Sequence, residues 1–270
     1  MLANPKDIPI LSDRTQLDHR IKLEQKFMRN LQRDLLARTK GADAQAIPII
    51  INRTIADHCW GLWLAGIKHG RDHGKLEVKI AGVKTAKFAL LDDRDPPSKM
   101  QNTRAQDAIW ARVKTIASNN SDTQWRKIQA ALVENVRGES DRSQLQAAII
   151  DSLGGESYAK QAETIARTEL TFAYNAGRVQ TYRENGVQAV RRYCIRDERT
   201  CEQCAGLNGM VARLDDMAAM MRLHAPSHPN CRCTTGVLLD IKQLAEANRE
   251  PPPLPKQTWM MGSIVAAIIN

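Results

Sequence analysis

The sequence predicts a predominantly helical α+β protein, in which a helical N-terminal half is followed by a small α+β domain with a cysteine-rich loop. Apolar residues recur at helical spacing through most of residues 12–185, and the clearest alternating, strand-like segments come after them. Four of the six cysteines and two of the six histidines lie between residues 201 and 233. These observations place helices first and a small, cysteine-bearing sheet region last.

The first predicted helix spans residues 12–39. Ile21, Met28 and Leu35 recur at heptad spacing, and Gly41 provides a C-terminal stop. Two roles remain open for this segment: pairing with a partner chain, or docking as an amphipathic helix on its own domain.

A strongly apolar helix is predicted next, over residues 47–68. Residues 70–91 contain glycines, short alternating pieces and an excess of lysine and arginine. This composition predicts a hairpin or an extended basic arm.

The segment 92–98 contains Pro96 and Pro97, which break regular structure and mark a possible hinge. Three further helices are predicted over residues 101–118, 122–136 and 142–153. Gly154 and Gly155 close this series, so we place a domain boundary there and expect residues 1–153 to form a mainly helical basic domain.

A second domain is predicted over residues 156–240. It begins with one long helix that Asn185 and Gly186 terminate. Its remaining elements are predicted as strands at 187–196, 207–211 and 234–241 and a short helix at 215–223. Residues 241–270 form a proline-rich linker and a C-terminal tail.

The net charge of +9 is concentrated in the first part of the chain. Residues 1–150 carry 25 Lys and Arg against 17 Asp and Glu, a balance of +8, whereas residues 151–240 carry 11 of each. Such a field favours an acidic partner, either DNA or a negatively charged protein surface. An ordinary solvated basic surface is the alternative.

Residues 1–10 contain two prolines and no continuous apolar run of the kind found in signal peptides. We therefore expect a soluble protein made in the cytoplasm, with no membrane partner. In a reducing compartment cysteines are more often metal ligands or core residues than disulfides.

The cysteine-rich loop contains a C-x-x-C pair at Cys201 and Cys204. A C-x-x-C turn places two thiolates at the spacing a tetrahedral ion needs, and a second ligand pair closes the site. His228, Cys231 and Cys233 offer three candidates for that second pair, so the predicted set is Cys201, Cys204, Cys231 and either His228 or Cys233. Thiolate and imidazole ligands favour a structural zinc ion. Packed reduced thiols and a disulfide formed after lysis are the alternatives.

Cys59 and Cys194 lie in apolar sequence and are predicted to be small buried core residues. His69 and His73 have the i,i+4 spacing of a ligand pair but lack the H-E-x-x-H arrangement. We therefore do not assign them to a metal site.

Several short motifs occur in a fixed order over the second domain: T-I-A-R-T-E at 164–169, N-A-G at 175–177, D-E-R-T-C-E-Q-C at 197–204, L-N-G at 207–209 and H-P-N-C-R-C at 228–233. Together they resemble the phage Mu protein F-like head morphogenesis family. The resemblance covers about a third of the chain, and residues 1–150 and the tail after 240 resemble nothing we can name.

The resemblance implies a minor capsid component of a tailed phage that associates with the portal protein inside the procapsid and is packaged with the DNA. The implied location is the virion, inside the head at the portal vertex, after assembly in the host cytoplasm. Further candidate partners are the major capsid protein, a scaffolding protein and double-stranded DNA. No enzymatic activity is expected, and no catalytic residue is assigned.

Within the motifs, Arg167 and Glu169 are predicted to form a buried or interface ion-pair network, with plain surface positions as the alternative. Asn175 and Gly177 are expected to let the long helix approach the strand or the cysteine loop. Asp197 is expected to cap the C-x-x-C turn or to bind Arg232.

Two other functions remain open. The basic first half is compatible with a non-enzymatic DNA-binding protein. An H-N-H-like metal-dependent nuclease also combines cysteine pairs with histidines, but it requires a histidine base and an open metal position. Because the histidines here lie among the cysteines, the spacing favours a closed structural site.

Overall fold

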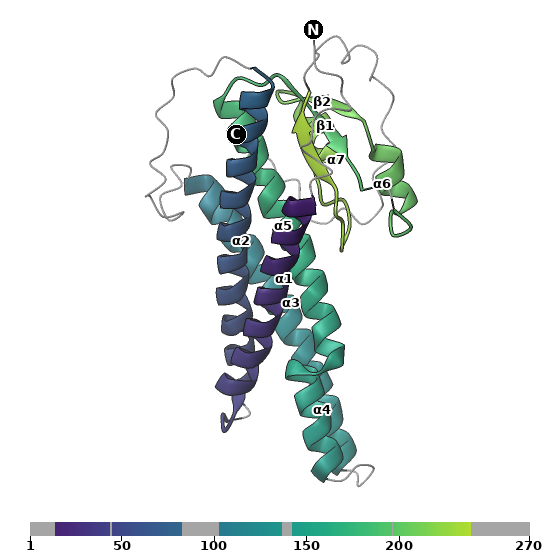
Figure 1. The fold of residues 1–270 in the computed structure, drawn as a ribbon. Coiled ribbons are helices and arrows are strands. Elements are labelled where there is room, and N and C mark those ends of the chain that lie inside the picture. Colours follow the sequence, from purple (N-terminus) through teal and green to yellow (C-terminus); the bar gives the residue numbers. More distant parts are fainter. Residues whose placement is uncertain (1–13, 44, 83–102, 137–141, 196, 239–270) are drawn as a thin grey trace. The chain divides into compact units, whose positions relative to one another are not determined.

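The computed structural model describes residues 14–43, 45–82, 103–136, 142–195 and 197–238 (Figure 1). The described elements are α1 (Arg14–Thr39), α2 (Ile47–Ile80), α3 (Thr103–Val136), α4 (Arg142–Gly154), α5 (Glu156–Glu184), β1 (Ala189–Tyr193), α6 (Glu202–Leu207), β2 (Val211–Arg213), α7 (Met217–Leu223) and β3 (Thr234–Val237). Helices dominate, and a small antiparallel sheet follows them. The predicted fold class is confirmed.

The hairpin or basic arm predicted over residues 70–91 is wrong for its described part, because α2 continues without a break to Ile80. Gly70 and Gly74 do not interrupt the helix, since they lie where a neighbouring helix approaches closely. A Cβ at Gly70 would meet the backbone carbonyl of Tyr174, and one at Gly74 would meet Thr181. Tertiary packing therefore outweighs the helix-weakening effect of glycine.

The predicted break between 118 and 122 is also wrong, because α3 is one helix. The Asn120 side chain donates to the carbonyl of Ile116 at 2.7 Å, so the asparagine bonds back to its own helix instead of ending it. The predicted hinge at 92–98 and the tail 241–270 lie outside the described residues.

The chain divides into two compact units, each built from separate stretches of sequence: one from residues 1–19, 63–108 and 167–270, and the other from 20–62 and 109–166. We refer to them as the sheet unit and the helical unit. The division at 153–156 proposed from the sequence stays a prediction.

The helical unit has a core of aliphatic side chains from α1 and α2, including Leu31, Leu35, Ile51 and Ile55, each fully buried. Polar contacts tie its helices together. His58 lies 3.0 Å from the Asp34 carboxylate, and the Ser121 hydroxyl donates to the carbonyl of Pro48 at 2.9 Å.

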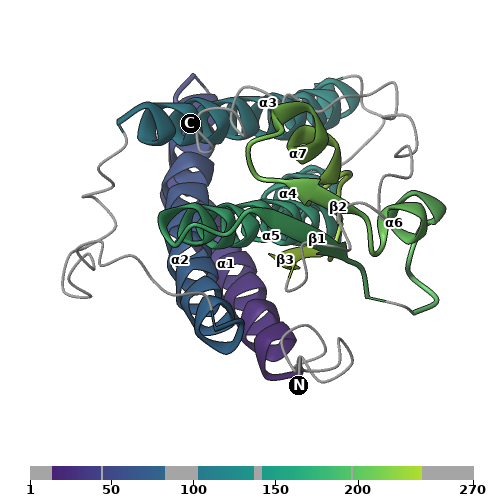
Figure 2. The ribbon, with the colours of Figure 1, turned by 90° about the horizontal axis from the view of Figure 1, so that it is seen from above.

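The sheet unit is organised around the second part of α5, which lies beside α2 (Figures 1 and 2). A Cβ at Gly177 would meet the backbone carbonyl of Ile67, so the two helix backbones lie too close together for any residue other than glycine. Gly177 therefore serves an approach to α2, not to the strand or the cysteine loop as the sequence suggested.

A buried polar network joins α2 and α5. The Arg178 guanidinium is fully buried and donates to the Glu77 carboxylate, and the Tyr182 hydroxyl donates to the same carboxylate. Arg178 Nε also donates to the Tyr182 hydroxyl at 2.9 Å. Every charge in this network therefore has a partner, as burial requires.

The three strands form an antiparallel sheet in the order β2-β1-β3 beside α5 (Figure 2). Val190 pairs with Val237 and Tyr193 with Thr234, while Ala189 pairs with Arg213 of β2. The first and third predicted strands are confirmed near these positions. The strand predicted at 207–211 is wrong, because α6 extends to Leu207 and β2 begins only at Val211.

None of the helices in the described part of the chain combines the length and apolar character needed to cross a membrane.

A candidate metal centre in the cysteine-rich region

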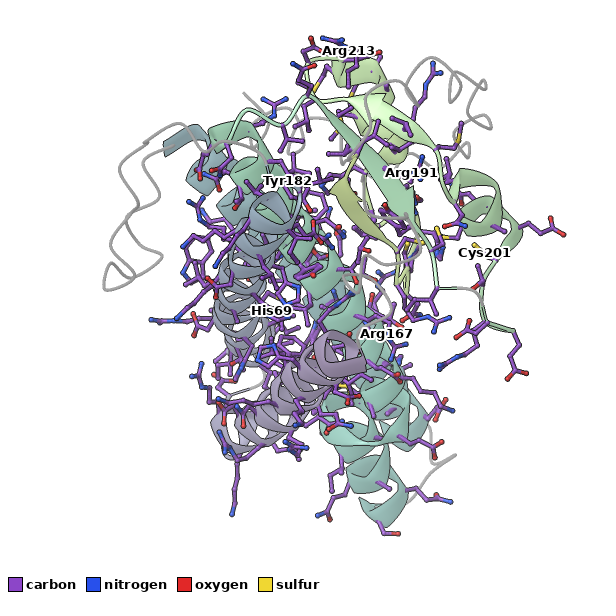
Figure 3. All side chains as sticks on the ribbon, turned by 45° about the horizontal axis from the view of Figure 1, so that its top comes forward. His69, Arg167, Tyr182, Arg191, Cys201 and Arg213 are labelled. Carbon is purple, nitrogen blue, oxygen red and sulfur yellow. The ribbon has the colours of Figure 1, made fainter. Side chains whose placement is uncertain are left out.

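The C-x-x-C turn forms the start of α6. Cys201 is the N-cap residue, and its sulfur accepts a hydrogen bond from the backbone N–H of Cys204 at 3.4 Å. Cys201, labelled in Figure 3, is exposed, whereas Cys204 is buried. This short helix thus presents one thiol at the surface and one toward the interior.

His228 and Cys231 approach this turn from the loop that follows α7. His228 Nε2 lies 3.2 Å from the Cys201 sulfur and 3.0 Å from the Cys204 sulfur. The Cys231 sulfur lies 3.7 Å from that of Cys204. Ligand atoms of Cys201, Cys204 and His228 all lie within 4.8 Å of one another. Residues far apart in sequence therefore converge on the C-x-x-C turn.

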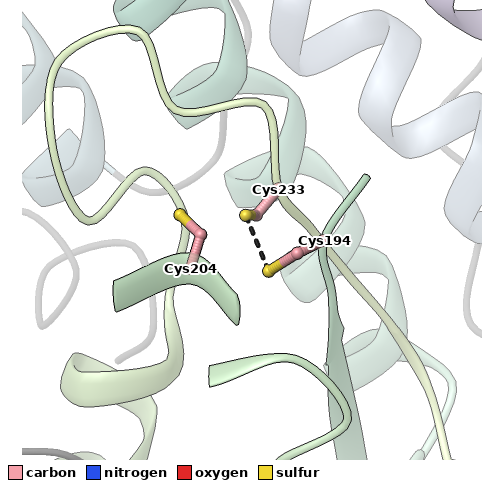
Figure 4. Close-up of side chains that lie close together, drawn as sticks. All are labelled: Cys194, Cys204 and Cys233. Atoms are coloured by element: carbon pink, nitrogen blue, oxygen red, sulfur yellow. Dashed lines mark hydrogen bonds between the residues drawn. The ribbon is translucent and has the colours of Figure 1, made fainter. Parts of the chain in front are cut away.

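Cys233 belongs to a neighbouring group with Cys194. Their sulfurs lie 2.8 Å apart, and together with Cys204 they form a second cluster within 4.8 Å (Figure 4). The sheet explains the pairing: Tyr193 is opposite Thr234, so continuing the antiparallel register places Cys194, just after β1, opposite Cys233, just before β3.

The sequence interpretation missed Cys194 as part of this region. The prediction of a buried core residue holds for Cys59, which is fully buried, but Cys194 is half-buried and packs against Cys204, Cys231 and Cys233. Only the register of β1 on β3 could have revealed this, and single-sequence patterns do not specify register.

Arg192 lies beneath the cysteines with its side chain fully buried. Its guanidinium donates to the backbone carbonyls of Leu223 and His224, at 2.9 and 3.0 Å, and approaches the sulfurs of Cys204 and Cys231 at 3.8 and 3.5 Å. Burial opposes its charge, but the sulfurs of Cys231, Cys233 and Cys194 outweigh burial and raise the pKa of Arg192.

The cysteines and His228 shift one another's protonation. Hydrogen bonding to Cys204 holds the pKa of Cys231 well below its usual value, and hydrogen bonding to Cys231 raises the pKa of His228 to about 9. Hydrogen bonding to Cys194 raises the pKa of Cys204. These shifts favour a Cys231 thiolate beside two cationic side chains, Arg192 and His228, when no ion is bound.

The loops that carry the cysteines are fixed by polar side chains of α5. The Thr171 hydroxyl donates to the Cys231 carbonyl at 3.0 Å. Asn175 donates to the Cys233 carbonyl at 3.2 Å and accepts from the Thr235 N–H at 2.8 Å. The expectation that Asn175 joins the long helix to the cysteine loop is confirmed.

Asp197 and Arg232 form a two-bonded ion pair, with donor–acceptor distances of 2.7 and 2.6 Å. Hydrogen bonding to Arg232 holds the pKa of Asp197 well below its usual range. The predicted contact between these residues is confirmed, and it ties the segment before the C-x-x-C turn to the loop between Cys231 and Cys233.

Glu169 is buried, as expected, and accepts a hydrogen bond from the indole N–H of Trp63 at 3.2 Å. Arg167 donates to the side chain of Asn230 at 3.4 Å. Glu169 therefore connects α5 to α2, and Arg167 connects it to the cysteine loop. The predicted ion-pair network of these two residues stays a prediction.

Part of the chain is similar to a known protein family. Residues 126–236 match the phage Mu protein F like family. The match includes the whole of α5 and the cysteine-rich region, so the resemblance seen in the sequence is confirmed and extends further toward the N-terminus. No curated protein and no solved structure matches the chain.

The match relates this part of the chain to a family of phage head morphogenesis proteins. The cysteine and histidine groups of the same region can hold a metal ion. Which residues would bind it stays a prediction at this point.

Proposed function

We propose that the protein is a minor head protein of a tailed phage that associates with the portal protein inside the procapsid and remains in the virion. The Mu F-like match over residues 126–236 is the observation that carries this proposal. The basic residues 1–150, with a balance of +8, supply a field suited to an acidic surface on the portal, on a capsid or scaffolding protein, or on DNA.

Co-expression with the portal protein of the same phage tests this. We expect the chain to co-sediment with the portal oligomer and to be missing from heads assembled without a portal. An even distribution over the capsid lattice, in heads that contain the portal and in heads that lack it, would overturn the proposal.

We further propose that the cysteine-rich region binds one structural zinc ion. Four protein ligands fill a tetrahedral zinc site and leave no position for substrate, which suits a scaffold and not a hydrolase. When bound, the ion would cross-link the α6 turn to the loop after α7 and so contribute folding free energy at a cluster whose buried members are three cysteines and Ala225.

Elemental analysis of the purified protein checks the zinc proposal. We expect close to one zinc per chain, and loss of the metal in the double variant Cys201→Ser, Cys204→Ser. A content below about 0.2 zinc per chain in the unaltered protein, purified without chelator, would reject it, because structural zinc sites bind tightly at neutral pH.

DNA binding without catalysis is the second candidate function, favoured by the same positive charge. Binding that weakens steeply with salt in gel shifts would support it. No shift at low salt would leave the portal as the partner to be examined.

A further inference from the structure

We propose that the zinc ion is held by Cys201, Cys204, His228 and Cys231, that Arg192 supplies its counter-charge from beneath, and that Cys194 and Cys233 are not ligands. This inference rests on the zinc site proposed above and names its ligands. Sequence spacing leaves either His228 or Cys233 as the fourth ligand, and this inference selects His228.

The distances fit one tetrahedral ion. With Zn–S of about 2.3 Å and Zn–N of about 2.0 Å, tetrahedral geometry separates two sulfurs by about 3.8 Å and a sulfur from a nitrogen by about 3.5 Å. Cys204 and Cys231 are 3.7 Å apart, and His228 Nε2 is 3.0 and 3.2 Å from its two sulfurs. Each of these three distances lies within about 0.5 Å of its tetrahedral value. Cys231 joins the group of Cys201, Cys204 and His228 through its contact with Cys204.

The His228 ring is oriented as a metal-binding histidine. Its Nδ1 lies 2.7 Å from the backbone carbonyl of Pro229, so Nδ1 carries the proton and donates it. When an ion replaces the proton on Nε2, this ring orientation directs the Nε2 lone pair toward the space beside Cys201 and Cys204. A carbonyl that accepts from the second ring nitrogen is the usual support of a zinc-bound histidine.

Cys233 is held away from the ion by the sheet. Its position opposite Cys194 follows from the β1–β3 register, and the 2.8 Å between their sulfurs is about 1 Å shorter than two thiolates on one zinc ion require. A site built on Cys194, Cys204 and Cys233 would therefore have to pull this pair apart. It would also leave His228 pointing at Cys201 without an ion.

The charges agree with the same assignment. A zinc ion with three thiolates and a neutral imidazole carries a formal charge of −1, which one guanidinium balances, whereas four thiolates would leave −1 after that balance. Arg192 directs N–H groups at the sulfurs of two of the proposed ligands, Cys204 and Cys231. Among the described residues its hydrogen-bond partners include sulfurs and carbonyls but no carboxylate, so a thiolate-rich centre is the charge that it can balance.

Single variants of the full chain separate ligands from neighbours. We expect Cys233→Ser and Cys194→Ser to retain close to one zinc per chain, and His228→Ala and Cys231→Ser to lose at least about tenfold in zinc affinity, measured by competition with a chromogenic chelator. Retention by His228→Ala together with loss by Cys233→Ser would overturn the assignment. Absence of zinc from the unaltered protein would instead reject the zinc site itself. The proposed association with the portal is tested independently, by co-sedimentation.

Replacement of zinc by Co²⁺ gives a second, spectroscopic readout of the ligand set. The ligand-field bands of Co²⁺ respond to the number of sulfur ligands, so His228→Cys should restore binding and move these bands to longer wavelength, whereas Cys233→His should leave them unchanged. A band shift in Cys233→His, with none in His228→Cys, would show that Cys233 is the fourth ligand.

The role of Arg192 is tested by comparing a neutral replacement with a positively charged one. Arg192→Met should lower zinc affinity by about tenfold or more, and Arg192→Lys, which keeps the charge but loses the two-pronged geometry, should lower it less. Far-ultraviolet circular dichroism of each variant monitors the helices. Equal zinc affinity in the folded Met variant and the unaltered protein would remove Arg192 from the proposal.

Discussion

At the scale of single residues, the sheet unit buries two arginines completely and balances them by different means. Arg178 faces the carboxylate of Glu77, whereas Arg192 faces sulfurs and backbone carbonyls. A buried cation costs several kcal/mol unless it is paired. The Arg178 pair is therefore complete in the protein alone, while Arg192 depends on the charge state of the cysteines.

Glu77→Gln should destabilise the fold by about 3–5 kcal/mol, because it leaves the Arg178 charge buried without a carboxylate. Urea unfolding followed by circular dichroism measures the change. Glu184→Gln is the matched control: its pair with Arg71 is partly exposed, so we expect a loss of at most about 1 kcal/mol. Equal losses in the two variants would contradict this account of the network.

His224 is a buried base near Phe172, with ring centroids 5.0 Å apart, and burial lowers its pKa to about 3. In the unfolded chain its pKa is about 6.5, so between pH 6.5 and 3 the unfolded state binds the extra proton. His224 therefore makes stability fall as pH decreases through this window, by up to about 1.4 kcal/mol per pH unit.

His224→Phe should flatten that dependence. Chemical unfolding of both proteins at several pH values between 7 and 4 checks it, with the metal state kept the same in each pair. Parallel curves for the two proteins would mean that His224 is not the group that titrates.

At the scale of elements, α2 is where sequence patterns gave the wrong structure and where packing explains why. Its glycines look like breaks when taken alone, yet Gly70 lies against the α5 backbone. Gly61 occupies the same helix, but a Cβ there would meet nothing within 4 Å. Both positions are glycines of the same helix, but only Gly70 has another helix packed against it.

Gly70→Ala should lower the free energy of unfolding by about 2 kcal/mol or more, because the new Cβ would force α2 and α5 apart. Gly61→Ala should raise it by about 0.5–1 kcal/mol, the gain in helix propensity. Thermal and urea unfolding of the pair measure both effects. A stabilising Gly70→Ala would show that the close approach of the helices is not required.

What the sequence could predict followed from local patterns. The long α5 helix ends where Asn185 and Gly186 suggested. The C-x-x-C turn was recognisable from spacing, although spacing left the choice between His228 and Cys233 open. The position of Cys194 among the other cysteines and the burial of Arg192 against them could not be predicted. Both depend on strand register and on the approach of the loop after α7. Long-range pairing of this kind leaves no trace in residue spacing.

At the scale of the whole molecule, the Mu F-like match and the compact units do not coincide. The matched residues 126–236 include Arg178 and Tyr182, but their partner Glu77 lies outside the match, as does Trp63, which binds Glu169. The sheet unit therefore needs α2 residues that the family match does not cover.

A fragment limited to residues 126–236 should consequently be less protected than the intact chain. We expect amide hydrogen exchange in residues 167–184 to be faster by about 100-fold or more, since the α2 contacts that cover this helix are missing. Addition of a peptide spanning residues 47–80 should restore part of the protection. Exchange as slow as in the full chain would show that this region folds without α2.

The distance along the chain between Glu77 and its two partners also has a consequence during synthesis. Arg178 follows Glu77 by 101 residues and Tyr182 by 105. At about 5–20 residues per second, a ribosome needs roughly 5–20 s to deliver them after the glutamate has been made. Throughout that interval Trp63 and the glycines of α2 that contact α5 have no α5 to cover them. We therefore expect chaperones to bind this stretch of the nascent chain.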